Sequence, residues 1–265
     1  MWAVPALAKG ESNSCNYFSF HVTRGGPSTE STPVTDPNLL ATPSRSKDST
    51  LTVALFRLAE IESGGTISLD GVDLSTIPLS DLRGRRHGMC IIQQDPVLFS
   101  GTLRDCLNPF GESSDEEVLD ALVSVRVADT DLRGAAALTD VVEEGGIHFS
   151  AGERQLLCLA RGILVRPRVL VLDEETASVD GETDAFVQHM LRTRFPGTTL
   201  LTIAHRLNTI MDYDVILVID QGKSVEFGSP KELLDRDGLF GKLVDSTGEE
   251  SSSALRAAAN SGKIL

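Results

Sequence analysis

The sequence has no long apolar run and comparatively few basic residues. Lys and Arg total 24 against 38 Asp and Glu, for a net charge of -14. A surface of that sign repels nucleic acid and anionic lipid headgroups, so we expect neither as a direct partner. No apolar stretch approaches the roughly 20 residues that a helix needs to cross a bilayer. We therefore expect no membrane insertion by this chain itself.

Cysteine is also scarce, with 4 residues in the whole chain and none in a CxxC pair. Their spacing suits neither a zinc site nor a disulfide framework. We expect reduced structural thiols, which is typical of a cytoplasmic protein.

Glycine is absent between Gly26 and Gly64, and residues 27–50 contain 14 Ser, Thr or Pro among 24. Such a stretch buries little apolar surface. We expect residues 1–50 to form a disordered or aberrant arm, with ordered structure from about Leu51. The Ser- and Ala-rich residues 249–265 are expected to be a flexible tail.

The remaining residues, 51–248, alternate between two periodicities. Continuous apolar runs at 169–172, 199–204 and 215–219 predict strands that are covered on both faces. Residues 155–164 have the apolar spacing of an amphipathic helix. Helices alternating with buried strands indicate an α/β domain with a largely parallel sheet.

Shorter signals complete this pattern. Residues 51–58 have helical spacing, and 66–69 read as a strand closed by an Asp70-Gly71 turn. Ser114 followed by three acidic residues predicts a helix start. Residues 224–227 are expected to pair in a hairpin with the preceding strand.

Two adjacent carboxylates, Asp173 and Glu174, follow the strongest of the predicted strands. Sites in open α/β sheets lie at such carboxyl ends. One acid could hold Mg²⁺ and the other could orient a nucleophilic water. Four apolar residues followed by Asp-Glu are common, however, so in isolation a solvated strand end is the more usual explanation of the pair.

Other polar residues stand at similar positions. Ser150 and Gly152 open the helix at 155–164, and a helix start with an unhindered backbone can bind an anion, although an ordinary N-cap explains Ser150 as well. His205 follows a buried strand, where a structural histidine is the more usual reading. Gln94 follows an apolar pair and has little meaning alone.

Taken together and in this order, these segments resemble the ATP-binding-cassette (ABC) ATPases. The matching parts are the Q-loop at Gln94, the signature loop at 150–153, Walker B at Asp173 and Glu174, the D-loop at 178–180 and the H-loop at His205. The surrounding residues 94–105, 155–161 and 173–180 are most similar to the second nucleotide-binding domain of the C subfamily, the multidrug-resistance-associated exporters. The resemblance covers about residues 51–259.

The resemblance implies a RecA-like core with a parallel sheet and an inserted helical subdomain at about 108–160. It implies ATP and Mg²⁺ as cofactors, and a second nucleotide-binding domain and transmembrane domains as partners, at the cytoplasmic face of a membrane. Asp173 and Gln94 would serve the metal, Glu174 would polarise water, and His205 would contact the γ-phosphate. Ser150, Gly152 and Glu153, with Asp180 in the D-loop, would bind nucleotide across a dimer.

The sequence departs from the family at the phosphate-binding Walker A loop. Residues 42–50 lack the glycines that let backbone N–H groups approach phosphates. Depending on register, Asp48 or Lys47 stands at the lysine position, and Ser49 and Thr50 are the nearest hydroxyls. Glu153 replaces the usual signature Gln and adds negative charge. The strands expected before Walker A are not recognisable in residues 1–41.

This break near residue 50 indicates a missing or degenerate front end, through a truncated reading frame or a degenerate paralogue. The preferred prediction is an exporter ATPase domain crippled at Walker A. A non-catalytic regulatory or interaction domain is the first alternative. A soluble ABC ATPase of translation or DNA repair is the second, and the acidic charge argues against it.

Overall fold

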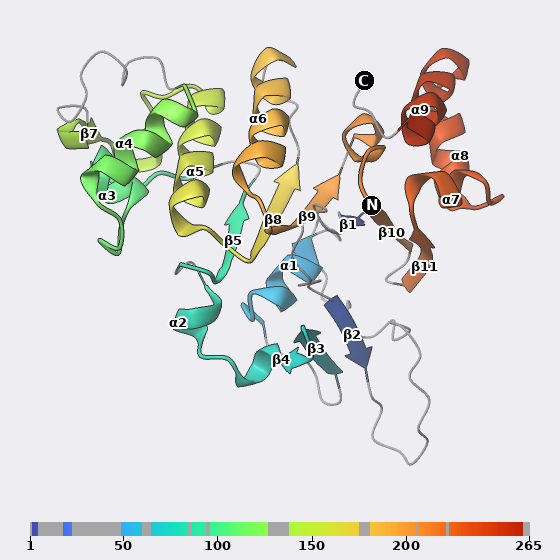
Figure 1. Cartoon of the computed structure of the whole chain (residues 1–265), viewed down its shortest axis with the longest axis horizontal. Coiled ribbons are helices and arrows are strands. Elements are labelled where there is room, and N and C mark those ends of the chain that lie inside the picture. The colour runs from blue at the N-terminus through green and yellow to red at the C-terminus, as the bar shows by residue number, and fades with distance from the viewer. Residues whose placement is uncertain are drawn as a thin grey trace. The chain divides into compact units, whose positions relative to one another are not determined.

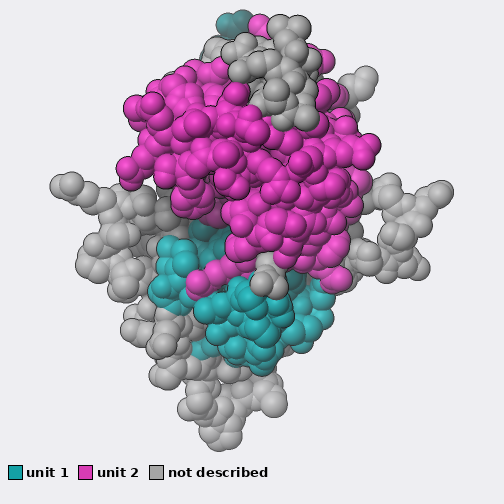
Figure 2. Space-filling view, turned by 90° about the vertical axis from the view of Figure 1, so that its left-hand side faces the viewer, with its two compact units in different colours: residues 1–82, 199–265 teal, residues 83–198 magenta. Residues whose placement is uncertain are grey.

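The computed structural model describes residues 2–4, 18–22, 49–59, 65–83, 86–93, 96–126, 138–174, 181–204, 206–220 and 223–261. The chain divides into two compact units. Unit 1 comprises residues 1–82 and 199–265, and unit 2 comprises residues 83–198 (Figure 2). No helix in these described ranges is both long and apolar enough to span a bilayer.

Unit 2 is built on a parallel strand pair, β5 (Met89–Ile92) and β8 (Val169–Glu174), with Ile92 paired to Leu172. Helix α5 (Ala151–Val165) packs against β5 and helix α6 (Gly181–Arg194) packs against α5, as Figure 1 shows. Val169 to Val171 are fully buried, as the continuous apolar run predicted.

The rest of unit 2 is a small helical region beside α5. It contains β6 (Gly101–Thr102) paired with β7 (Val141–Val142), and the helices α3 (Leu103–Leu107) and α4 (Asp115–Ser124). Capping boxes open both helices, formed by Thr102 with Asp105 and by Ser114 with Glu117. The predicted helix start at Ser114 is therefore confirmed, while a separate subdomain at 108–160 stays a prediction.

Unit 1 contains strands from both ends of the chain. Strand β1 (Trp2–Val4) lies between β9 (Thr199–Ala204) and β10 (Val215–Asp220) and runs antiparallel to both. Strand β11 (Lys223–Gly228) pairs antiparallel with β10, which confirms the predicted hairpin pairing. The two predicted strands β9 and β10 therefore run in the same direction.

A second sheet in unit 1 has the order β2 (Phe18–Val22), β3 (Gly65–Leu69) and β4 (Val72–Asp73). Asp70 and Gly71 both have positive φ, 52° and 79°, as the predicted tight turn requires. Helix α1 (Ser49–Leu55) begins two residues before the predicted start. Helix α2 (Leu79–Leu82) is the last element of unit 1 before the chain enters unit 2.

No strand is recognisable from the sequence before residue 42, yet β1 and β2 lie there, so the prediction of a disordered arm is wrong for residues 2–4 and 18–22. Both pair with strands that are distant along the chain, β1 with β9 and β10, and β2 with β3. Pairing of this kind is not visible in local composition. The boundary at residue 50 and the character of the other residues before it stay predictions.

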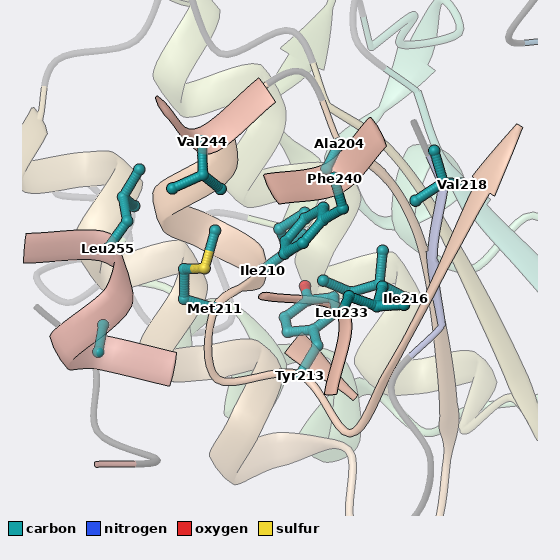
Figure 3. Close-up of a cluster of buried hydrophobic side chains, with 11 residues drawn as sticks. Ala204, Ile210, Met211, Tyr213, Ile216, Val218, Leu233, Phe240, Val244 and Leu255 are labelled. Atoms are coloured by element: carbon teal, nitrogen blue, oxygen red, sulfur yellow. The ribbon is translucent and has the colours of Figure 1, made fainter. Parts of the chain in front are cut away.

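Buried hydrophobic residues from the C-terminal part of the chain form a packed cluster in unit 1 (Figure 3). We call the buried residues Ala204, Ile210, Met211, Tyr213, Ile216, Val218, Leu233, Phe240, Val244, Leu255 and Ala258 the C-terminal cluster. They come from β9, β10, the turn between them, and the helices α7 (Pro230–Leu234), α8 (Leu239–Asp245) and α9 (Glu249–Ser261).

The prediction that residues 249–265 form a flexible tail is wrong for residues 249–261, which form helix α9. Ser252, Leu255 and Ala258 are buried at helical spacing along one face. The carboxylate of Asp245 accepts hydrogen bonds from Ser252 Oγ at 3.0 Å and from Arg256 Nη2 at 2.7 Å. A single leucine among alanines and serines was too weak a signal to reveal this face.

Candidate functional site

The adjacent acids Asp173 and Glu174 are the last two residues of β8, so their predicted place at the end of a strand is confirmed. The side chain of Asp173 is half-buried. Asp173 lines a hollow of about 20 Å³ together with Gln155 of α5 and Gln188 of α6. A space of this size with polar lining can hold about one water molecule. The remaining lining of this hollow is apolar.

The strand beside β8 leads toward the predicted Q-loop. Because β5 and β8 are parallel with Ile92 opposite Leu172, the chain leaves both strands at the same edge. Gln94 comes two residues after the end of β5 and itself lies outside the described residues. The predicted convergence of Gln94 on Asp173 therefore stays a prediction.

The signature serine, Ser150, is the exposed N-cap of α5, as predicted. Its backbone N–H donates to Glu153 Oε2 at 2.8 Å, and its Oγ accepts from Glu153 N at 3.2 Å. Arg154 Nη1 donates to the carbonyl oxygen of Phe149 at 2.8 Å and fixes the chain just before the cap. Ser150 is therefore an ordinary N-cap, and both hydrogen bonds of its capping box are present.

The capping box has a consequence for anion binding. Glu153 places a carboxylate at the positive end of α5 and engages a backbone donor there. A phosphate approaching the same N–H groups competes with that carboxylate. The hydroxyl of Ser150 remains able to donate, since it only accepts in this arrangement. Gly152 lies in the first turn of the helix, where it adds no side chain between an anion and the backbone.

Several predicted site residues fall outside the structure's described part. Lys47, Gln94, Asp180 and His205 are not described, nor are the side chains of Ser49, Thr50 and Glu174. The elements next to them are in place: α1 begins at Ser49, β9 ends at Ala204 and α6 begins at Gly181. Of the predicted site, the structure describes Asp173 and Glu174 at a strand end and residues 150–153 at a helix start.

A larger hollow of about 260 Å³ lies elsewhere in unit 2, at residues that the sequence did not indicate as a site. We call it the arginine hollow, because Arg86 and Arg161 line it together with Cys90, Phe99, Asn108 and Phe110. Phe99 and Phe110 are 62% and 61% exposed. Phe99 and Arg161 stand in segments that carry the family resemblance, and Phe110 lies just beyond one of them. Nothing in the spacing of the three residues distinguishes them from ordinary surface and core residues.

Comparison with known proteins gives concordant results. The family profile described as "ABC transporter" matches residues 48–177. ATP-binding cassette sub-family C member 2 of Mus musculus is 49% identical over 203 residues, which cover 77% of this chain and 13% of that protein. ABC transporter C family member 12 of Dictyostelium discoideum is 47% identical over 216 residues, covering 81% of this chain and 16% of that protein.

A solved structure extends the likeness to three dimensions. The structure described as a bacterial Atm1-family ABC exporter with ATP bound has 33% sequence identity and a TM-score of 0.67 over 77% of this chain and 36% of that one. The chain spans only about 13% to 16% of the length of the mouse and Dictyostelium relatives. The predicted α/β fold of the ABC ATPases is confirmed.

Proposed function

The chain belongs to the ABC transporter family of ATP-binding domains, and on that premise we propose that it is the ATPase domain of an ABC-type exporter with a weakened phosphate-binding loop. The observation that carries the proposal is the placement of Asp173 and Glu174 at the carboxyl end of β8, beside the parallel strand β5. In sheets of this type, that edge is where phosphate chemistry is assembled.

The residues fit Mg-ATP where the structure describes them. Asp173 is a half-buried carboxylate, and Mg²⁺ prefers such hard oxygen ligands. When bound, ATP supplies the phosphoryl group, and Mg²⁺ neutralises part of the negative charge of the phosphates. Asp173 and Gln94 are proposed to hold the metal, Glu174 to orient water and His205 to contact the terminal phosphate.

Two further groups of residues complete the proposed site. Lys47, Ser49 and Thr50, which come closest in the sequence to the phosphate-binding Walker A residues, are proposed to contact the phosphates of the chain's own site. Ser150, Gly152, Glu153 and Asp180 are proposed to face a nucleotide held by a second nucleotide-binding domain. The transmembrane domains of the exporter are the other proposed partner, which would place the chain at the cytoplasmic face of a membrane.

The weakness is proposed to arise at residues 42–50. The family profile matches from Asp48 onward, and no glycine stands between Gly26 and Gly64. Each charge-assisted hydrogen bond to phosphate contributes roughly 1.5 to 3 kcal/mol. Losing two of them costs about 3 to 6 kcal/mol, or roughly two to four decades in affinity. Asp48 adds repulsion to this loss.

Isothermal titration and phosphate release on the full chain test the proposal, beside a chimera in which residues 1–50 are replaced by the corresponding segment of the mouse relative. We expect negligible Mg-ATP binding by the natural chain, and restored binding with slow turnover by the chimera. Micromolar binding or steady turnover by the natural chain would overturn the proposed weakness.

A matched variant separates an ATPase domain from a non-catalytic interaction domain. In the chimera, Glu174→Gln is expected to abolish turnover while leaving ATP affinity within a few-fold, because it removes a water-orienting carboxylate and no phosphate contact. A chimera that binds ATP without any turnover, with or without Glu174, would favour the interaction domain instead.

A further inference from the structure

Two segments of unit 2 that lie far apart in the sequence meet at Leu98 and Gly146. Leu98 follows the end of β5 by six residues and is 1% exposed. Gly146 precedes the signature serine, Ser150, by four residues and is buried. The backbone N–H of Gly145 donates to the carbonyl oxygen of Leu98 at 3.0 Å. We call this meeting of the two segments the Leu98–Gly146 joint.

The joint leaves no room for a side chain at residue 146. A Cβ atom on Gly146 would lie 2.7 Å from Leu98 Cδ1 and 3.2 Å from both Cβ and Cγ of Leu98. Carbon atoms in favourable contact are about 3.5 to 4.0 Å apart. Because Leu98 is buried, its side chain cannot turn into solvent to make space. Glycine is therefore needed for the two backbones to approach this closely.

The joint is the end of a short antiparallel ribbon. Strands β6 and β7 pair beside it, and the backbone N–H of Leu103 donates to the carbonyl oxygen of Asp140 at 2.9 Å. The segments 98–103 and 140–146 are therefore linked by backbone hydrogen bonds at both ends and in the middle. Two segments linked in this way keep a fixed register relative to each other.

A series of hydrogen bonds leads from the joint to the start of α5. The carbonyl oxygen of Gly146 accepts from the backbone N–H of Phe149 at 2.9 Å. The carbonyl oxygen of Phe149 accepts in turn from Arg154 Nη1, in the second turn of α5, at 2.8 Å. Ser150 comes next and forms the capping box with Glu153. The residues between 146 and 150 are thus closed into a turn, so the position of Gly146 determines that of Ser150.

We propose that Gly146 is a positioning residue for the signature end of α5, and that its close contact with Leu98 holds Ser150 where a nucleotide can meet it. Gly146 itself touches no nucleotide and acts through the turn that ends at Ser150. The inference rests on the proposed function for what Ser150 contacts, namely a nucleotide held by a second nucleotide-binding domain. The joint itself lies within this chain and exists without that partner.

Two neighbouring glycines provide a matched pair of variants. Gly145 and Gly146 both have positive φ, 73° and 65°, so the backbone strains an alanine at either position. A Cβ atom on Gly145 would have Ile147 Cγ2 as its nearest neighbour, at 4.0 Å, which is an ordinary contact. Gly145→Ala is therefore the control for Gly146→Ala, because only the second variant places a methyl group against Leu98.

Amide NMR and hydrogen exchange of the labelled full chain, without nucleotide, are the first measurement. We expect Gly146→Ala to move the amide resonances of Ser150 and Glu153. Exchange of these two amide hydrogens should become about tenfold faster, which corresponds to about 1.4 kcal/mol of local opening free energy. Gly145→Ala is expected to leave both residues unchanged. Equal effects of the two variants on Ser150 and Glu153, or no effect of Gly146→Ala, would overturn the proposal.

A second substitution tests whether the contact with Leu98 is the cause. Leu98→Ala removes Cγ and Cδ1, two of the three atoms that the new methyl group would meet. In the Gly146→Ala chain, it should return the Ser150 resonance toward its natural position, so the effects of the two substitutions are not additive. Additive shifts, or an unfolded Gly146→Ala chain that Leu98→Ala fails to restore, would count against the joint. The two glycine variants decide the question if Leu98→Ala alone is too unstable to study.

Association with a second nucleotide-binding domain tests the consequence for function. The partner is the chimera with the replaced front end, carrying Glu174→Gln so that ATP is not consumed, and the natural chain and its two glycine variants are immobilised in turn. In Mg-ATP, we expect Gly146→Ala to bind this partner about tenfold more weakly than Gly145→Ala does. Equal affinities would overturn the positioning role of Gly146. Failure of the natural chain to associate at all would count against the proposed function alone, because the NMR result requires neither nucleotide nor partner.

Discussion

The C-terminal cluster of unit 1 and the arginine hollow of unit 2 are both formed where helices pack on strands, but they differ in whether their buried polar groups have hydrogen-bond partners. In the cluster, the Tyr213 hydroxyl reaches the Thr202 hydroxyl at 3.0 Å and every other member is apolar. At the hollow, two guanidinium groups have buried donors without an acceptor among the residues that the structure describes. The buried hydroxyls of the first region therefore satisfy each other, whereas these buried donors of the second region have no acceptor in the described part of the chain.

The largest effect that tests this comparison is expected at the centre of the cluster. Phe240 is fully buried (Figure 3), so Phe240→Ala should lower the free energy of unfolding by about 3 to 5 kcal/mol through lost burial and a residual cavity. Urea titration measures it. Phe227→Ala, at a ring that is 62% exposed, is the control and should change stability by less than about 0.5 kcal/mol. Similar losses in both variants would contradict the packing described here.

A somewhat smaller effect is expected from helix α9. Leu255 is 6% exposed and joins α9 to the cluster, so Leu255→Ala should cost about 2 to 4 kcal/mol. Ser253→Ala, on the exposed face of the same helix, should be nearly neutral. If Leu255→Ala leaves the urea midpoint unchanged, α9 contributes nothing to the fold and the flexible-tail prediction would be restored.

The polar pair within the cluster offers a finer test. Tyr213→Phe removes the hydroxyl that meets Thr202 and leaves a buried oxygen without this partner, which costs about 1 to 3 kcal/mol. Adding Thr202→Val removes the orphaned hydroxyl, and the double variant should recover much of the loss. A double variant less stable than either single one would show that the hydroxyls are held by other contacts.

The smallest effect is expected beside the hollow and depends on pH. The backbone N–H of Ser114, together with Arg86 and Arg166, lowers the pKa of the Glu117 carboxyl below its ordinary 4.5. Because the folded-state pKa lies below the unfolded one, the stabilisation by Glu117 is full above pH 4.5 and is lost as pH falls through the folded value.

Glu117→Gln should therefore lower the unfolding midpoint at pH 7, with the difference shrinking as the solution is acidified. The matched variant is Glu116→Gln, which removes one exposed charge from the same turn of α4 and none of these contacts. A difference between natural chain and Glu117→Gln that stays constant down to the acid limit would contradict the lowered pKa.

The elements that were predicted correctly have signals confined to one segment. Strand β8 begins with a run of four apolar residues, and α5 repeats its apolar residues every three to four positions. The start of helix α4 is marked in the sequence by Ser114 and Glu117, which form its capping box. The order of the motifs around residues 94, 150, 173 and 205 was sufficient for the family, because each motif lies at a fixed place relative to such an element.

The sequence by itself determined the α/β fold, the family, and the strand-end and helix-start positions of Asp173 and Ser150, because periodicity and capping act between neighbours. Only the tertiary structure decided the rest. It paired β1 with β9 and β10 from the other end of the chain. It buried one face of α9, and it brought Arg86 and Arg161, which are 75 residues apart, to one hollow. Such features depend on which distant surfaces exclude water from each other, and no local pattern records that.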